Sequence, residues 1–317
     1  MSRLLVIAGP TASGKTEVAY EISKRLPTEM ISCDSMQVYR GMPILTNARK
    51  SGEGRGERGQ SKIHLISFLD PCREEYSAAR FRKDAEFHIR RVLKKKKMPL
   101  LVGGTGLYLR TLLDGLFEAD AGSVLKDETL RRKLILEEEK NGSGFLHKKL
   151  QKVDAPSAAR IHPNDTRRVV RALEVYQLTQ KPFSSQKERR KGLREELGAR
   201  IFLIDRDRED LYRRINARVN RMMRGGLARE VKGLLRKNLS LTARMALGIR
   251  EIEAHLQGKL TLEEAKLLLM KNTRNYAKRQ LSWFRHEKGV EPIEVSPDEP
   301  ASVTAGKILN LWEIPSA

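Results

Sequence analysis

The sequence has little cysteine, few aromatic residues and no long apolar run. Its 317 residues include two cysteines, Cys33 and Cys72, whose wide separation argues against a disulfide framework and against a cysteine-built zinc site. The apolar runs have the length of strands and fall well short of the roughly 20 residues that cross a membrane. The N-terminus lacks the three regions of a signal peptide. These absences predict a protein of the reducing cytoplasm with no membrane partner.

Acidic residues are also scarce relative to basic ones. There are 40 Asp and Glu against 62 Lys and Arg, which gives a formal net charge of +22 and a pI near 10.1. Such an excess attracts polyanions such as nucleic acid, although a generally basic proteome would also explain it. The length favours two domains over one, and nothing in the sequence demands more than a monomer.

A glycine-rich motif, GPTASGKT, begins at Gly9. An apolar strand over Leu4–Ala8 precedes it, and apolar residues at helical spacing follow over Thr16–Leu26, which is the context of a phosphate-binding loop. Its backbone N–H groups point at an anion, Lys15 adds a charge and Thr16 offers a hydroxyl to Mg²⁺. The alternative is a glycine turn with a coincidental lysine. The predicted diphosphate-binding residues are Gly9, Pro10, Thr11, Ala12, Ser13, Gly14, Lys15 and Thr16.

Further apolar segments alternate with a helical pattern. Short strands are expected at 30–32, 99–102 and 200–204, with a helix over 78–93 between the first two. This helix is expected to place Phe81, Ala85, His88 and Val92 along one side. The alternation is typical of an α/β fold, a parallel sheet flanked by helices.

The pattern changes after Phe117 to charged helices with few strand signals. We therefore expect an all-helical insertion over 118–198, between the 1–117 and 199–317 parts of one α/β core. Residues 49–62 are rich in glycine and charge and lack an apolar period, so they predict a mobile loop.

Several motifs occur in an order that resembles the tRNA dimethylallyltransferases, also called tRNA isopentenyltransferases. After the phosphate loop come CDSMQVYRGM from Cys33, GGTGLY from Gly103, IHPND from Ile161, RALEV from Arg171, LYRRINAR from Leu211, TRNYAKRQ from Thr273 and WFR from Trp283. Together they extend over nearly the whole chain. No cysteine or zinc-finger pattern follows Trp283, which favours the bacterial type of the family.

The resemblance implies a fold and a reaction. The fold is a P-loop NTPase-like sheet with an inserted helical domain that contacts tRNA. The reaction transfers the dimethylallyl group of dimethylallyl diphosphate to N6 of the adenosine immediately 3′ of the anticodon, and releases diphosphate. The implied partners are the tRNA anticodon stem-loop and dimethylallyl diphosphate, with Mg²⁺ as cofactor at Thr16. The phosphate loop would then hold the prenyl donor, and no nucleoside triphosphate need be hydrolysed.

The resemblance assigns Lys15, Asp34 and Thr105 to catalysis, and Arg214 and Arg218 to closing over the diphosphate. Asp34, the first polar residue after a strand, is the candidate general base for the adenine amine. It could instead bind magnesium or cap a turn. The two arginines share a face of one helix and could instead be solvated. Asp205, which ends an apolar strand, is a weaker candidate for a magnesium ligand.

Two basic stripes are expected to contact RNA, although each could be an ordinary solvated face. A helix capped near Asn164 should place Val169, Leu173 and Tyr176 on one face and its arginines on the other. A second stripe lies near the C-terminus. The predicted tRNA-binding residues are Asp34, Ser35, Met36, Gln37, Thr105, Arg167, Arg168, Val169, Val170, Arg171, Arg274, Lys278 and Arg285.

The chain departs from the family pattern at three places, namely Leu45 to Ala48, Ile63, and Ile249, where a tyrosine is common. Ile249 can neither stack nor hydrogen-bond as tyrosine could, so contacts to RNA are in question there. Three other functions remain open: an adenylate isopentenyltransferase, a small-molecule P-loop kinase, and an RNA-binding protein without activity. Transfer to AMP, phosphate transfer from ATP, or RNA binding without turnover would identify each.

Overall fold

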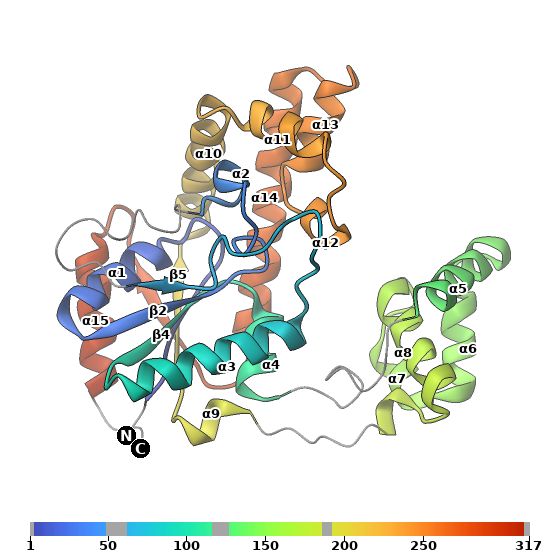
Figure 1. Ribbon diagram of the computed structural model, residues 1–317, viewed down its shortest axis with the longest axis horizontal. Coiled ribbons are helices and arrows are strands. Elements are labelled where there is room, and N and C mark those ends of the chain that lie inside the picture. Colours follow the sequence, from blue (N-terminus) through green and yellow to red (C-terminus); the bar gives the residue numbers. More distant parts are fainter. Residues whose placement is uncertain (1–2, 49–61, 116–126, 186–191, 314–317) are drawn as a thin grey trace. The chain divides into compact units, whose positions relative to one another are not determined.

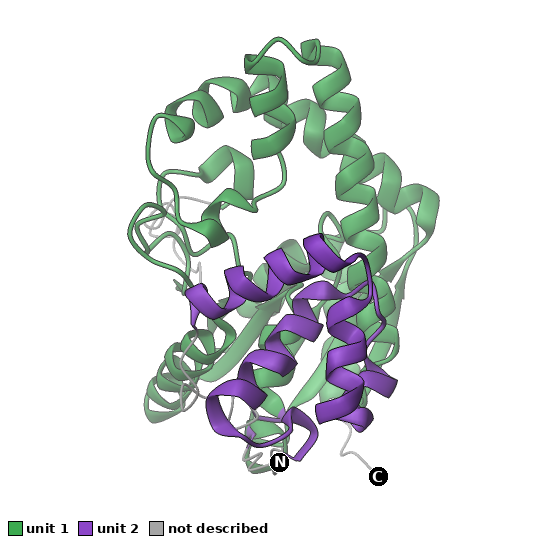
Figure 2. Ribbon diagram, turned by 90° about the vertical axis from the view of Figure 1, so that its right-hand side faces the viewer, with its two compact units in different colours: residues 1–113, 193–317 green, residues 114–192 purple. Residues whose placement is uncertain are grey.

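The computed structural model describes residues 3–48, 62–115, 127–185 and 192–313 (Figure 1). The chain divides into unit 1, residues 1–113 and 193–317, and unit 2, residues 114–192 (Figure 2). The sequence placed the insertion at 118–198. The structure assigns the segment from Leu193 to unit 1, because Leu193 and Leu197 are buried in its core. Apart from Lys62, the loop predicted at 49–62 lies outside the described residues.

Unit 1 is built on a six-stranded sheet in which all paired strands are parallel. The strand order is β3-β2-β4-β1-β5-β6. The strands are β1 (Leu5–Ala8), β2 (Thr28–Cys33), β3 (Ile63–His64), β4 (Met98–Gly103), β5 (Arg200–Arg206) and β6 (Val290–Val295). The predicted α/β class is confirmed, and each strand expected from the sequence is present within two residues of its predicted bounds.

Alternate strand residues pack on opposite faces of the sheet. Leu5 and Ile7 of β1 pack in the cluster that includes residues of α1 (Lys15–Arg25) and α15 (Ala301–Glu313). Leu4 and Val6 pack in the cluster of the other face, which includes residues of α3 (Ala78–Lys94) and α4 (Gly106–Leu113). Both faces are therefore covered, as expected for a parallel sheet.

Helix α3 differs from its predicted pattern at one position. Its buried residues are Phe81, Ala85, Ile89 and Val92, and His88 lies one position beside this stripe. The His88 ring is partly exposed and stacks on the His64 ring with centroids 4.4 Å apart. The prediction that His88 completes the apolar side was wrong, because Ile89 takes that place.

The remaining helices of unit 1 lie beyond the sheet. They are α2 (Pro43–Thr46), α9 (Leu193–Glu196), α10 (Arg208–Arg224), α11 (Leu227–Leu235), α12 (Leu241–Arg244), α13 (Ile249–Leu256) and α14 (Leu262–Arg285). Helix α14, with 24 residues, is the longest of the described helices, and it begins at a capping box in which Thr261 and Glu264 bond each other's backbone N–H groups. It packs against α10, α13 and α4, and Figure 1 shows that it extends from the sheet to the helical end of the unit.

Unit 2 is helical throughout its described part. It contains α5 (Glu128–Asn141), α6 (Phe145–Val153), α7 (Ala155–Arg160), α8 (Thr166–Thr179) and the 3₁₀ turn η1 (Phe183–Ser185). Glu174 is completely buried in it and accepts hydrogen bonds from Arg131 and Arg171. The cap of α8 is Asp165, whose side chain accepts from Arg168 N, so the prediction of Asn164 as the cap was off by one residue.

A buried carboxylate on β2 contacts both the edge strand β3 and the residues at the end of α3. Glu29 of β2 accepts hydrogen bonds from Lys95 and Lys97, and its Oε2 lies 2.8 Å from Nε2 of His64. Burial alone would raise the pKa of Glu29, but hydrogen bonds from Lys95, His64 and Lys97 outweigh it and lower this pKa to about 2. The charged form of Glu29 therefore favours the folded state.

We expect Glu29→Gln to destabilise the protein by about 2 kcal/mol at pH 7, because it weakens a buried charged contact. The contribution of Glu29 is complete above its ordinary pKa of 4.5 and is lost as the pH falls toward 2. The variant should therefore lose less stability than the wild type between these values. Urea unfolding as a function of pH measures both effects. Glu21→Gln, at an exposed pair with Lys24, is the matched control, and equal curves for Glu29→Gln and wild type would contradict the assignment.

Candidate active site

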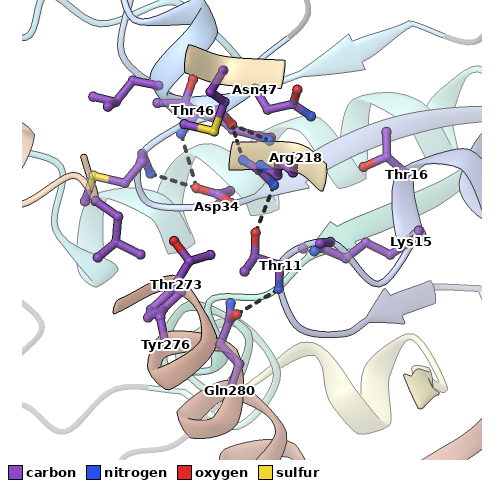
Figure 3. A pocket seen from close by; sticks show the side chains of 18 of the residues that line it. Thr11, Lys15, Thr16, Asp34, Thr46, Asn47, Arg218, Thr273, Tyr276 and Gln280 are labelled. Carbon is purple, nitrogen blue, oxygen red and sulfur yellow. Dashed lines mark hydrogen bonds between the residues drawn. The ribbon is translucent and has the colours of Figure 1, made fainter. Parts of the chain in front are cut away.

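Unit 1 contains a cavity of about 920 Å³ beside the carboxyl ends of the central strands. The phosphate loop follows β1, the segment from Asp34 follows β2, and both contribute lining residues. Helices α10 and α14 supply further walls (Figure 3). Carboxyl ends of parallel strands are the usual place for a site in an open α/β sheet.

The phosphate loop presents its C-terminal half to the cavity. Thr11, Ala12, Gly14, Lys15 and Thr16 line it, whereas Gly9, Pro10 and Ser13 do not and form the framework of the loop. Gly14 has a φ of 93°, a conformation that glycine adopts without strain, and α1 begins there with no side-chain cap. The backbone N–H groups at the start of α1 are therefore left for an anion.

Two arginines of α10 donate hydrogen bonds to this loop, one to a carbonyl and one to a hydroxyl. Arg214 Nε donates to Ala12 O at 3.0 Å, and Arg218 Nη1 donates to the Thr11 hydroxyl at 2.9 Å. Both arginines line the cavity from α10, where their four-residue spacing places them on one face. This arrangement supports the predicted closing role over the solvated alternative.

Arg206, which the sequence analysis missed, also donates a hydrogen bond to the phosphate loop. It is buried at the end of β5, donates from Nε to Ser13 O at 2.7 Å and pairs with Asp210 at 3.1 Å. Arg206 belongs to no motif, and a buried arginine at a strand end has no signature in sequence.

Lys15 is poised between charged neighbours. Its Nζ donates to Pro10 O at 3.0 Å. Burial lowers the pKa of Lys15 to about 8, with the charge of Arg218 acting in the same direction and that of Asp34 opposing both. A bound diphosphate would raise this pKa again, because an anion favours the protonated amine.

Asp34 lines the cavity with one oxygen engaged. Its Oδ1 accepts the N–H groups of Met36 at 2.8 Å and Gln37 at 3.2 Å, so the carboxylate does cap a turn. Within the described residues, Oδ2 makes no hydrogen bond. The turn fixes the orientation of the side chain and leaves Oδ2 for a substrate proton, so the capping and catalytic roles are compatible.

The neighbours of Asp34 also face the cavity. Ser35, Met36 and Gln37 line it, and Gln37 Nε2 donates to Thr46 O at 3.4 Å. Thr105 is not among the lining residues. Its hydroxyl accepts the Ser35 N–H at 3.2 Å, so it supports the segment after Asp34.

Helix α14 lines the cavity with residues that the sequence analysis did not single out, namely Leu269, Thr273, Tyr276, Arg279 and Gln280. Figure 3 labels three of them, Thr273, Tyr276 and Gln280. Burial raises the pKa of Tyr276, and the charge of Asp34 adds to the rise, so the phenol stays protonated and can donate a hydrogen bond. All three fall within the TRNYAKRQ motif at spacings of three and four, and this spacing could have identified them as one helix face.

The basic residues of α14 that were predicted to contact RNA do not line the cavity. Arg274 lies over the Tyr212 ring, 5.5 Å from its centroid, and Lys278 is exposed. Arg285 donates to Asp205 and remains largely exposed. Asp205 is paired in this way and is not among the residues that line the cavity, so the structure gives no support to it as a magnesium ligand of this site.

In unit 2, the predicted RNA stripe is partly internal. Val169 and Val170 are buried in the helical core, so their side chains offer no surface to RNA and we withdraw them as contacts. Arg171 pairs with the buried Glu174. Arg167 and Arg168 are exposed and remain available to a phosphate backbone.

The three departures from the family pattern lie at packed positions. Ile249 is completely buried in the core, so it is not placed to contact RNA. Leu45 lines the cavity, and its N–H donates to Glu230 at 2.8 Å. Ile63 lies on β3 and also lines the cavity.

The side chains of the described residues show which metal ligands are available. In the described part of the chain, no group of three or more His, Cys, Asp or Glu side chains could hold an ion. In phosphate-loop proteins the Ser or Thr hydroxyl after the lysine is a ligand of Mg²⁺ together with substrate phosphates, and the Thr16 hydroxyl at the cavity wall suits that arrangement. Within the described ranges, no helix combines the length and apolar character needed to cross a membrane.

Known proteins resemble this chain over nearly its full length. Residues 37–287 match the model of a family described as IPP transferase. A tRNA dimethylallyltransferase of Desulforudis audaxviator is 45% identical over 92% of both chains, and one of Geobacter sulfurreducens is 43% identical over the same shares.

Solved structures give the same picture. A tRNA isopentenylpyrophosphate transferase of Bacillus halodurans is 37% identical, with a TM-score of 0.67 over 98% of this chain and 96% of its own. A eukaryotic dimethylallyltransferase acting on tRNA is 29% identical, with a TM-score of 0.78 over 98% of this chain and 79% of its own. The expected P-loop NTPase-like fold is confirmed. The chain therefore belongs to the IPP transferase family, whose members are the tRNA dimethylallyltransferases, a class of prenyltransferases.

Proposed function

We propose that this protein transfers a dimethylallyl group from dimethylallyl diphosphate to N6 of the adenosine immediately 3′ of the anticodon of tRNA. The observation that carries the proposal is that one cavity holds both halves of such a site. Lys15, Thr16 and two arginines face it on the donor side, and the Asp34 carboxylate faces it on the acceptor side.

The donor side suits a diphosphate leaving group. As the allylic C–O bond breaks, negative charge grows on the diphosphate, and Lys15, Arg214, Arg218 and the loop amides stabilise it. Mg²⁺ held by Thr16 would add positive charge at the same oxygens. Because the cations are in place before the reaction, they need not reorganise during it.

The acceptor side suits a weak nitrogen nucleophile. The lone pair of the adenine N6 is delocalised into the ring, so removal of its proton during attack lowers the barrier. The new bond joins N6 to the prenyl carbon that carries the diphosphate, the C–O bond of that carbon breaks with its electron pair leaving on diphosphate, and the N6 proton passes to Oδ2 of Asp34. To enter the cavity the base must leave its stack in the anticodon loop.

Unit 2 and the basic residues of α14 are proposed to bind the RNA backbone. Arg167 and Arg168 are exposed on α8, and Lys278 is exposed on α14.

Cys33 and Cys72 are free thiols, which suits a reducing compartment, so we place the reaction in the cytoplasm.

The test is single-turnover transfer of radiolabelled dimethylallyl from its diphosphate with Mg²⁺, offering unmodified tRNA and AMP in parallel. Label on the adenosine beside the anticodon is the expected result. Label on AMP alone would mean an adenylate isopentenyltransferase. Label on neither, with phosphate transfer from ATP, would mean a kinase, and tRNA binding without any transfer would mean a silent binder.

Replacing Asp34 by Asn should lower turnover by about 10²–10⁴-fold, the usual contribution of a general base. Asn still offers Oδ1 to the Met36 and Gln37 amides, so the turn should persist and tRNA affinity should change little. Single-turnover rates and tRNA titrations measure the two effects. Unchanged turnover would remove Asp34 as the base.

The donor kcat/KM should fall as the pH rises through about 8, because the free enzyme then loses the Lys15 proton that an anionic donor requires. Lys15→Ala should lower this constant by about 10²-fold at pH 7 and abolish the fall. Initial rates between pH 6 and 9.5 at low donor concentration check both. A flat wild-type profile over this range would count against the role of Lys15.

Replacing Arg168 by Ala should weaken tRNA binding and reduce the slope of log affinity against log salt by about one. Arg168 is exposed, and within the described residues its side chain pairs with Asp165 at 3.3 Å, so the unit should keep its fold. Arg132→Ala, at an exposed position of α5, is the matched control. Equal slopes for Arg168→Ala and wild type would mean that Arg168 is an ordinary solvated side chain that makes no phosphate contact.

A further inference from the structure

The side chain of Gln280 joins two loops that the proposed reaction uses separately. Gln280 lies on α14 and is 8% exposed. Its Oε1 accepts the N–H of Thr11 at 2.9 Å (Figure 3). Its Nε2 donates to the carbonyl of Gly104 at 2.8 Å. One carboxamide thus bonds the phosphate loop after β1 and the glycine turn after β4, in one defined orientation.

The glycine turn is shaped to receive this helix. A Cβ atom at Gly104 would collide with Nε2 of Gln280, and one at Gly106 would collide with the ring of Trp283. The lack of a side chain at both positions therefore allows the close approach of α14. Thr105 lies between these two glycines, so α14 contacts the turn on both sides of Thr105.

The contacts continue from this turn to the acceptor side. The Thr105 hydroxyl accepts the N–H of Ser35 at 3.2 Å, and Ser35 follows Asp34 directly. On the donor side, the Thr11 hydroxyl accepts a hydrogen bond from Arg218. A series of hydrogen-bonded residues therefore connects Arg218, on the donor side, through Gln280 to the segment that carries Asp34, the proposed base.

We propose that Gln280 is a positioning residue that sets the distance and angle between the donor loop and the acceptor segment. This inference rests on the proposed function. The carboxamide of Gln280 accepts from one backbone N–H and donates to a backbone carbonyl of another loop, and its two polar atoms lie on one rigid plane. Reacting atoms held even 1 Å out of place can lower a rate by about 10²-fold.

Two substitutions separate the contacts. Gln280→Met nearly fills the same space and can neither donate nor accept, which leaves the Thr11 amide and the Gly104 carbonyl without partners. Gln280→Glu keeps the acceptor for the Thr11 N–H and loses the donor to Gly104 O. Gln257→Glu, an exposed position at the end of α13, is the matched control for the change of charge.

Single-turnover transfer with both substrates saturating measures the effect on the chemical step. We expect Gln280→Met and Gln280→Glu to react about 10²-fold more slowly, with KM for tRNA and for the donor changed by less than about threefold. Gln257→Glu should match the wild type. If the wild type itself transfers nothing, the proposed function fails. If it transfers normally and both Gln280 variants react within twofold of it, the role of Gln280 is overturned.

Amide hydrogen exchange tests the geometry without reference to activity. The peptide that contains Thr11 should exchange faster in Gln280→Met than in the wild type, and should stay protected in Gln280→Glu, which still accepts from that amide. Equal exchange in all three proteins would overturn the contact. Unfolding midpoints are recorded beside it, and if Gln280→Met does not fold, the rate of Gln280→Glu decides.

Discussion

The arrangement of unit 1 depends on the concentration of positively charged side chains around the phosphate loop. These side chains are held in place by the loop itself, before any anion arrives. Lys15 donates to Pro10 O, Arg214 donates to Ala12 O, and Arg206 donates to Ser13 O. Like charges this close repel one another, and each cation is kept in place by a carbonyl of the loop it surrounds. A diphosphate that enters would find cations already oriented, which is the condition for electrostatic stabilisation of a leaving group.

The parallel sheet provides the second half of the site. Because all of its strands point the same way, the segments that follow β1, β2 and β4 emerge at one edge. The donor loop follows β1, Asp34 follows β2 and Thr105 follows β4. These three segments have no covalent reason to keep their spacing, so side chains from α10 and α14 bind them together. The long α14 serves this purpose because its face with Thr273, Tyr276 and Gln280 reaches the cavity.

Unit 2 is stabilised in part by buried charged side chains. Its core is small, and a buried ionic cluster around Glu174 joins α5 to α8. Burial would raise the pKa of Glu174, but hydrogen bonds from Arg131 and Arg171 lower it, so the carboxylate stays charged at neutral pH. This pairing uses Arg171 for stability and leaves Arg167 and Arg168 at the surface, which divides one basic stripe into a structural part and an exposed part.

The sequence by itself determined the fold class, the phosphate loop and the family, because glycine spacing, apolar runs and the order of motifs are local properties of the chain. It also placed Asp34, Arg214 and Arg218 in the site. Only the tertiary structure decided which members of each motif face the cavity. Val169 and Val170 proved to be core residues, and Asp205 proved to pair with Arg285. Arg206 and Gln280 act on loops about 190 and 270 residues away in the chain, and contacts over such distances leave no periodic signal in the sequence.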